Sequence, residues 1–241
     1  MRQAGGVSAS SPHPPYPYPH AATAALADRA ERLARATGRR GLIGVTGSPG
    51  AGKTTLARAV VAELNARHAA SAVHVPMDGF HLANATLDRL GLRDRKGAIE
   101  TFDGWGFVAL LERVRREGDH VVYAPAFERR VDEPVAGEIA IEASARIVVV
   151  EGNYLLGDDE PWHRVRGLVD EAWFCATGDD ERMLRLVRRH TEHGRTPDAA
   201  RAWAVEVDGA NAVRIDPTRE RADLVVSGVT GEVLEEAGPS A

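Results

Sequence analysis

The sequence predicts an α/β fold in which a parallel sheet carries helices on both of its faces. Apolar runs with the length of strands alternate with helical stretches along most of the chain, an order typical of βαβ units. Residues 147–150 read Ile-Val-Val-Val, a continuous β-branched run expected for a parallel strand that is covered on both faces. The 241 residues, 44% of them hydrophobic, are enough to form one domain with a large core.

The expected elements begin with a tail and a helix. Residues 1–20 are rich in Pro, Ser, Tyr and His, so they offer little to bury and are expected to be disordered. Residues 21–241 are expected to form a single domain. Its first helix carries Leu26, Ala30 and Ala34 on one face.

Strands and helices then alternate. Strands are expected at residues 41–45, 72–77, 147–150, 171–176 and 222–226. Helices are expected at residues 54–68, 106–117, 179–193 and 197–211. Residues 119–142 interrupt this order, because 120–123 and 138–141 could pair as an antiparallel hairpin or flap.

Composition limits the classes of partner. The formal net charge of -5 argues against a general nucleic-acid binder, which usually has a basic excess. The single cysteine, Cys175, excludes an intrachain disulfide and a Cys-based zinc site. No stretch approaches the roughly 18 apolar residues of a membrane span, and the N-terminus does not resemble a secretion signal. We therefore expect a cytoplasmic protein with no membrane partner.

The most specific motif is Gly-Ser-Pro-Gly-Ala-Gly-Lys-Thr at residues 47–54, which matches G-x-x-x-x-G-K-[ST] between an apolar strand and an amphipathic helix. Glycines allow the tight turn that presents backbone N–H groups to phosphate, and the following helix directs its N-terminus at the same anion. Lys53 is expected to reach the β- and γ-phosphates of ATP, and Thr54 to hold Mg²⁺. The motif predicts a P-loop NTPase fold whose nucleotide-binding residues are Gly47, Ser48, Pro49, Gly50, Ala51, Gly52, Lys53, Thr54 and Thr55.

A P-loop alone does not separate kinases from GTPases, ATPases and metallochaperones. The sequence has no Asn-Lys-x-Asp segment, the guanine-reading motif of many GTPases, and this counts against a switch protein. A nucleotide-dependent switch or assembly NTPase acting on a protein partner nevertheless remains the alternative.

Two carboxylates follow expected strands directly. The carboxyl ends of strands are where ligands bind in an open parallel sheet. Asp78 follows the strand at 72–77 and could accept the proton of an acceptor hydroxyl, although an Asp before Gly79 is also typical of a turn. Glu151 ends the run at 147–150 and could hold the water shell of Mg²⁺, or simply be solvated.

Arginines gather in a helix-turn-helix stretch. They are Arg182, Arg185, Arg188, Arg189, Arg195 and Arg201. A mobile lid at about residues 179–200 could close them over ATP and stabilise negative charge in the transition state. Acidic residues in the same stretch leave a solvated, salt-bridged helix as the alternative.

These segments resemble the phosphoribulokinase/uridine kinase family of P-loop kinases, which includes bacterial-type pantothenate kinase. The resemblance is greatest to its nucleoside/nucleotide kinase-like branch, whose members are often labelled fructose transport system kinases. It spans roughly residues 25–228. The matching segments are residues 47–55, 76–84 (Pro-Met-Asp-Gly-Phe-His-Leu-Ala-Asn), 95–98 (Arg-Lys-Gly-Ala), 100–103 (Glu-Thr-Phe-Asp), 122–127 (Val-Tyr-Ala-Pro-Ala-Phe), 150–156 (Val-Glu-Gly-Asn-Tyr-Leu-Leu), 185–195 and 208–212 (Asp-Gly-Ala-Asn-Ala).

The resemblance implies a five-stranded parallel core, a lid with arginines, and an ATP:alcohol phosphotransferase that uses Mg²⁺. By matching position it implies the catalytic residues Asp78, Lys53 and Arg189, the metal residues Thr54 and Glu151, and the phosphate-binding residues Arg185, Arg189 and Arg195. The acceptor-binding residues that it implies are Asp78, His81, Phe102, Asp103, Tyr123 and Arg129.

The expected acceptor is a small molecule with a hydroxyl group, such as a nucleoside, a sugar or a similar metabolite. Glu128 stands where an Asp is expected in this branch, and the segment around it differs from the uridine kinase pattern. Uridine is therefore not singled out as the acceptor. No nucleic-acid partner is expected, and the chain could form a homodimer.

Overall fold

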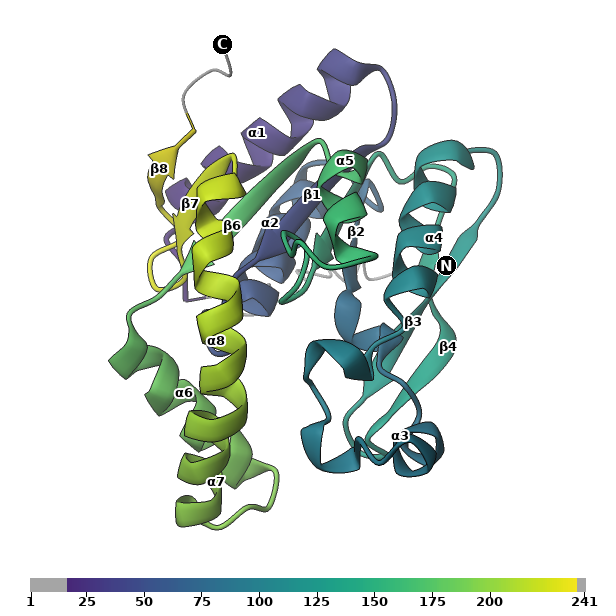
Figure 1. Ribbon diagram of the computed structural model, residues 1–241. Helices are drawn as coiled ribbons and strands as arrows, with labels where there is room; N and C mark the ends of the chain where they lie inside the picture. The colour runs from purple at the N-terminus through teal and green to yellow at the C-terminus, as the bar shows by residue number, and fades with distance from the viewer. Residues whose placement is uncertain (1–16, 238–241) are drawn as a thin grey trace, which may run out of the picture.

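The computed structural model describes residues 17–237, and a six-stranded sheet forms its centre (Figure 1). The strand order is β2-β5-β1-β6-β7-β8. The strands are β1 Gly41–Thr46, β2 Ala72–Pro76, β5 Ile147–Glu151, β6 Glu171–Ala176, β7 Leu224–Ser227 and β8 Val233–Glu236. The first five pair in parallel, which confirms the predicted parallel core of five strands. Strand β8 adds an antiparallel edge that the sequence did not predict.

Helices cover both faces of the sheet. Helices α1 (His20–Thr37) and α2 (Lys53–Arg67) pack on one face, while α4 (Gly104–Arg116), α5 (Val165–Leu168) and α8 (Gly209–Ile215) pack on the other. Successive strand residues point to opposite faces, so Trp173 and Phe174 of β6 enter different cores. Within residues 17–237, no helix has the length and apolarity that crossing a membrane requires.

A two-stranded antiparallel hairpin stands apart from the sheet. It joins β3 (Val122–Glu128) to β4 (Glu133–Ile141), and its register pairs Val122 with Ile141. The predicted pairing of 120–123 with 138–141 is thus confirmed, and we call this hairpin the flap. Its β3 strand passes so close to the short 3-10 helix Met77–Phe80 that a Cβ added at Gly79 would lie 2.2 Å from the Pro125 carbonyl oxygen.

A helical arm follows β6. It consists of α6 (Asp179–Glu192), α7 (Pro197–Trp203), a π-helical turn (Ala204–Asp208) and α8. The single helix predicted at 197–211 is therefore three consecutive segments. Figure 1 shows this arm on one side of the molecule, and the flap with α3 (Asn84–Leu90) on the other side.

The last residues of the predicted tail, 1–20, belong to the folded domain. Residues 1–16 lie outside the described residues, but α1 already begins at His20, and the side chain of Tyr18 is buried. The ring of Tyr18 packs against Gly231, and its hydroxyl approaches the Gly52 carbonyl at 3.4 Å. The boundary at residue 20 was therefore wrong, because one aromatic side chain ties this segment to the domain.

Candidate active site

The P-loop connects β1 to α2 in a backbone conformation that requires its glycines. Gly47, Gly50 and Gly52 have φ of 139°, 78° and 104°, a region that L side chains rarely adopt. A Cβ at Gly47 would also lie only 2.4 Å from the Cys175 carbonyl oxygen. The loop therefore turns tightly against β6, with the N-terminus of α2 at its end.

Lys53 lies at the bottom of the loop, where its ammonium group donates a hydrogen bond of 3.1 Å to the Ser48 carbonyl oxygen. Burial lowers the pKa of Lys53, and the carboxylates of Glu151 and Asp78 act in the opposite direction. Both predicted carboxylates therefore lie within electrostatic reach of the P-loop lysine. The three side chains lie at the carboxyl ends of three strands: Lys53 after β1, Asp78 after β2 and Glu151 at the end of β5.

Thr54 and Glu151 form the candidate metal site. Thr54 Oγ1 donates a hydrogen bond of 3.1 Å to Glu151 Oε2, and His74 Nε2 lies 3.7 Å from the same oxygen. Burial raises the pKa of Glu151, but the neighbouring His74, Lys53 and Thr54 lower it by more than burial raises it. The net shift is downward, so the carboxylate is ionised.

These two oxygen donors suit Mg²⁺ that is also bound by waters and substrate phosphates. They are too few to bind a metal ion through protein ligands alone. Mg²⁺ prefers hard oxygen ligands and usually keeps several waters, needing one or two protein groups beside substrate phosphates. A hydroxyl and an ionised carboxylate at the P-loop meet that need. Within residues 17–237 there is no cluster of three His, Cys, Asp or Glu side chains that could hold a metal by itself.

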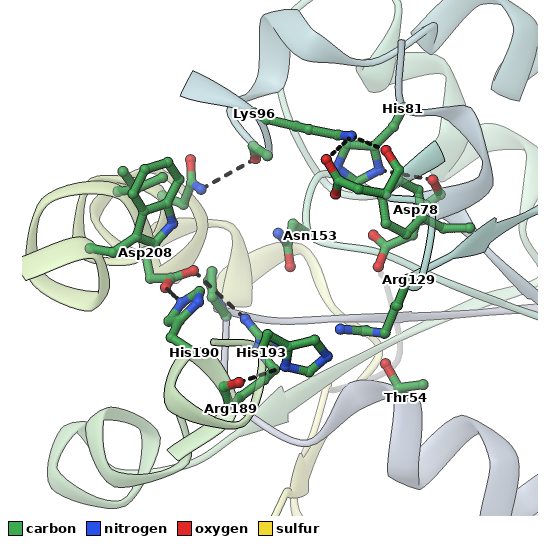
Figure 2. Close-up of a pocket in the computed structure, with 18 of the residues that line it drawn as sticks. Thr54, Asp78, His81, Lys96, Arg129, Asn153, Arg189, His190, His193 and Asp208 are labelled. Carbon is green, nitrogen blue, oxygen red and sulfur yellow. Dashed lines mark hydrogen bonds and ion pairs between the residues drawn. The ribbon is translucent and has the colours of Figure 1, made fainter. Parts of the chain in front are cut away.

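One cavity of about 560 Å³ connects the P-loop with the flap and the arm. The predicted site residues that line it are Pro49, Gly50, Lys53, Thr54, Asp78, His81, Phe102, Arg129, Glu151, Arg189 and Arg195. Figure 2 shows two groups of side chains on opposite sides of this cavity, His81, Asp78 and Lys96 on one side and Arg189, His190 and Asp208 on the other. The strand-end residues and the arm thus meet in one space.

Several predicted residues lie elsewhere. Asp103 is the N-cap of α4, where its Oδ1 accepts a hydrogen bond of 2.8 Å from the Gly106 N–H. Tyr123 is 58% exposed on the flap and does not line the cavity. Arg185 lies behind the loop, where its guanidinium group donates to the Gly228 carbonyl at 3.1 Å. The structure does not bring these three residues to the predicted site.

The remaining P-loop residues do not line the cavity. Ser48 and Ala51 line a second pocket of about 270 Å³, which also contacts Thr177, Arg182 and Arg219. Gly47, Gly52 and Thr55 line neither pocket. Their place is in the turn and in the first turn of α2.

His81 forms an aromatic wall with two phenylalanines. Its ring centroid lies 4.0 Å from that of Phe102 and 4.8 Å from that of Phe127. Burial lowers the pKa of His81, so the ring is neutral near pH 7. Its Nδ1 lies 2.8 Å from the Asp78 carbonyl oxygen, which fixes the ring beside the backbone of the candidate base.

Sequence reasoning missed two polar pairs at the cavity. Lys96 Nζ lies 2.9 Å from Asp132 Oδ2 of the flap turn, and His190 Nε2 lies 2.8 Å from Asp208 Oδ2 in the arm. Lys96 and Asp208 fall in segments that carried the family resemblance, but no local motif assigned them a partner. Asp208 ends the π-helical turn, a feature often found at functional sites.

The fold and this cavity define a P-loop kinase. The chain belongs to the phosphoribulokinase/uridine kinase family, whose sequence profile matches residues 42–234. The predicted family is thereby confirmed.

Individual relatives agree with this family. The chain is 38% identical over 133 residues to the ATP-dependent kinase-like protein notR' of Aspergillus versicolor, covering 52% of this chain and 77% of that protein. It is 34% identical over 190 residues to YggC of Escherichia coli, covering 78% of each. A crystal structure described as a "putative fructose transport system kinase" from Silicibacter sp. TM1040 superposes with a TM-score of 0.77 at 39% identity, covering 84% of this chain and 98% of that one.

Proposed function

We propose that the protein is an ATP:alcohol phosphotransferase in which Asp78 receives the acceptor hydroxyl. The observation that carries this proposal is that Lys53, Asp78, Glu151 and Arg189 line the same cavity. A phosphate donor site, a carboxylate for the acceptor and an arginine of the arm therefore border one cavity. Positioning and charge neutralisation are the main requirements of phosphoryl transfer.

The P-loop half of the cavity holds the triphosphate of ATP. Backbone N–H groups of the loop and the N-terminus of α2 face the phosphates, and Lys53 contacts the β- and γ-phosphates. Arg189 and Arg195 of the arm balance charge on the transferred group. Thr54 and Glu151 would hold Mg²⁺, and the ion would neutralise negative charge on the phosphate oxygens.

Asp78 acts on the acceptor in the same cavity. Its carboxylate accepts a hydrogen bond from the acceptor hydroxyl and turns the oxygen toward the γ-phosphorus. As the new P–O bond forms, the bond from the γ-phosphorus to the bridging oxygen of ADP breaks, and Asp78 takes the hydroxyl proton. In the part of the chain that the structure describes, no Lys, Arg or His forms an ion pair with Asp78, so no cation competes with the acceptor hydroxyl for this carboxylate.

The nucleoside part of ATP lies in the second pocket, on the other side of the P-loop. Its volume of about 270 Å³ and its lining of Phe174, Thr177 and Arg182 suit an adenosine group. Bound ATP then has its nucleoside in this pocket and its triphosphate along the P-loop, with the γ-phosphate in the larger cavity.

Acceptor-dependent ADP formation tests the proposal. Purified protein is incubated with MgATP and a panel of nucleosides, sugars, glycerate and pantothenate, and ADP release is compared with a control that lacks acceptor. We expect at least one acceptor to stimulate turnover. Fast ATP hydrolysis that no acceptor stimulates would refute the kinase proposal, and a GTP preference with nucleotide-controlled protein binding would favour a switch NTPase.

A further inference from the structure

The acceptor half of the cavity carries more positive than negative charge. From residues 78 to 132 the cavity is lined by three cations, Arg93, Lys96 and Arg129, and by two carboxylates, Asp78 and Asp132. This surplus contrasts with the formal net charge of -5 of the whole chain. The local excess therefore belongs to this wall and not to the protein surface in general.

Asp132 neutralises part of this group. Its carboxylate lies 2.9 Å from Lys96 Nζ and 3.7 Å from the Arg93 guanidinium. Lys96 also donates to the Asn84 side chain at 2.6 Å and to the Asp132 carbonyl at 2.5 Å. Lys96 therefore uses its three N–H donors on Asn84 and Asp132, and these hydrogen bonds hold the tip of the flap.

Of the three cations on this wall, Arg129 is the one that Asp132 does not pair with. It follows β3 in the flap, and in the described residues its guanidinium group has no acidic partner within 4.0 Å, although it lines the cavity. Figure 2 shows this side chain pointing into the cavity. Its neighbour Arg130 differs, because it pairs with Glu128 at 3.3 Å and does not line the cavity.

The position of Arg129 assigns it to the acceptor and not to ATP. It lies two residues beyond Phe127, whose ring packs against His81 on the wall beside Asp78. The triphosphate already has Lys53, Arg189 and Arg195 from the P-loop and the arm. Arg129 is exposed and has no acidic partner of its own in the described residues, so an anionic group on the acceptor would form charge-assisted hydrogen bonds with it, whereas a neutral acceptor offers it no such partner.

We infer that the acceptor is an anionic alcohol, a small hydroxy compound that also carries a phosphate or a carboxylate, and that Arg129 binds this anionic group. The inference rests on the proposed function and names the substrate class of the same site. The acceptor hydroxyl lies at Asp78 and its carbon skeleton lies against the His81–Phe102–Phe127 wall. The flap, held by Lys96 and Asp132, sets the distance between hydroxyl and anion.

Matched pairs of acceptors test the inference. Glycerate is compared with glycerol for the carboxylate, and ribose 5-phosphate with ribose for the phosphate. Both ADP formation and calorimetric binding in the presence of MgADP are measured. We expect the anionic member of at least one pair to have the higher kcat/KM and the tighter binding, and the pair that responds identifies which anion is recognised.

Substitutions at the adjacent residues Arg129 and Arg130 test whether Arg129 is the residue that binds the anionic group. Arg129→Gln is expected to raise KM and Kd for the anionic acceptor by about 10- to 100-fold, the range for losing a hydrogen bond to a charged group, without changing KM for ATP. Arg129→Lys should restore part of the affinity. Arg130→Gln removes a neighbouring charge outside the cavity and should behave as the unmodified protein.

Each outcome decides between the claims. Equal or better use of the neutral members, no binding of the anionic ones, or an Arg129→Gln effect on ATP alone overturns the inference. Anionic compounds that bind through Arg129 without being phosphorylated support the inference and refute the proposed kinase activity. Neutral acceptors that are phosphorylated as well as or better than their anionic partners refute the inference and leave the kinase activity intact.

Discussion

Thr54 Oγ1 donates a hydrogen bond of 3.1 Å to Glu151 Oε2, although 97 positions separate the two residues in the sequence. The contact exists because β1 and β5 are neighbours in the sheet, where Val45 pairs with Glu151. The first turn of α2 and the end of β5 therefore meet at the P-loop. Two oxygen donors fixed in this way provide a preformed site for Mg²⁺ beside the phosphates.

Glu151→Gln should weaken the use of Mg²⁺. The amide keeps the size of the side chain but removes its negative charge, so the apparent affinity for Mg²⁺ should fall by about 10- to 100-fold. A titration of Mg²⁺ against the rate of ADP formation at fixed ATP measures this change. Glu138→Gln, at an exposed position on the flap, is the matched control. An unchanged Mg²⁺ requirement in the Glu151 variant would exclude this residue from the metal site.

Asp78→Asn should separate transfer from ATP binding. The substitution removes the group that accepts the hydroxyl proton, so kcat should fall by about 10²- to 10⁴-fold. The Asp78 carbonyl that contacts His81 is unaffected, and the affinity for ATP should therefore stay the same. Steady-state kinetics and nucleotide binding report the two quantities. Asp28→Asn, at an exposed position of α1 that does not line the cavity, is the control, and undiminished transfer in Asp78→Asn would eliminate Asp78 as the base.

Local sequence signals predicted the elements that depend on neighbouring residues. The β-branched run at 147–150 indicated a covered strand, and both Asp78 and Glu151 could be placed because they follow strands of a parallel sheet. Strand β8 was missed because all four of its residues are exposed and two are Glu, so it lacks the apolar pattern of the core strands.

Long-range pairs could not be predicted in the same way. Asp103 matched the resemblance to acceptor-binding residues, yet its side chain caps the helix that starts at the next position. The pairing of Lys96 with Asp132 depends on how the flap packs over the segment that follows β2. No periodicity or motif contains that information, since it exists only once the two segments are brought together.

Asp208→Asn should loosen the arm. Asp208 Oδ2 lies 2.8 Å from His190 Nε2, and Oδ1 lies 3.9 Å from the guanidinium group of Arg189. Removal of this buried charge should raise KM for ATP and lower the free energy of unfolding by about 1–3 kcal/mol. Kinetics and urea unfolding measure both effects. Asp198→Asn changes an exposed carboxylate of the same arm and should do neither, and equal behaviour of the two variants would remove Asp208 from this role.

Cys175 should be inert in the folded protein. Burial raises the pKa of its thiol to about 12, so at pH 8 the thiol stays almost entirely protonated. A disulfide reagent should react slowly with the native protein and rapidly, with one equivalent, in guanidinium chloride. Fast reaction of the native protein would show that Cys175 is not buried behind the P-loop.

The same shift predicts a pH dependence of stability. Because the pKa in the folded state lies above that of the unfolded chain, this stabilising contribution is present below pH 9 and is lost as the pH rises toward 12. The difference in free energy of unfolding between the unmodified protein and Cys175→Ala should therefore be constant below pH 9 and shrink above it. A difference that grows in this range would contradict the assignment.

Tyr18 should stabilise the domain through its ring and not through its hydroxyl. The hydroxyl contacts are long, 3.4 Å to the Gly52 carbonyl and 3.5 Å to the Gly228 carbonyl, while the ring packs against Gly231. Tyr18→Phe should therefore change the free energy of unfolding by less than about 1 kcal/mol. Tyr18→Ala should lower it by about 3 kcal/mol, because it leaves a cavity between the start of α1 and the edge of the sheet. Urea unfolding of both variants provides the comparison, and a Tyr18→Ala protein as stable as the unmodified one would mean that the chain before α1 does not belong to the folded core.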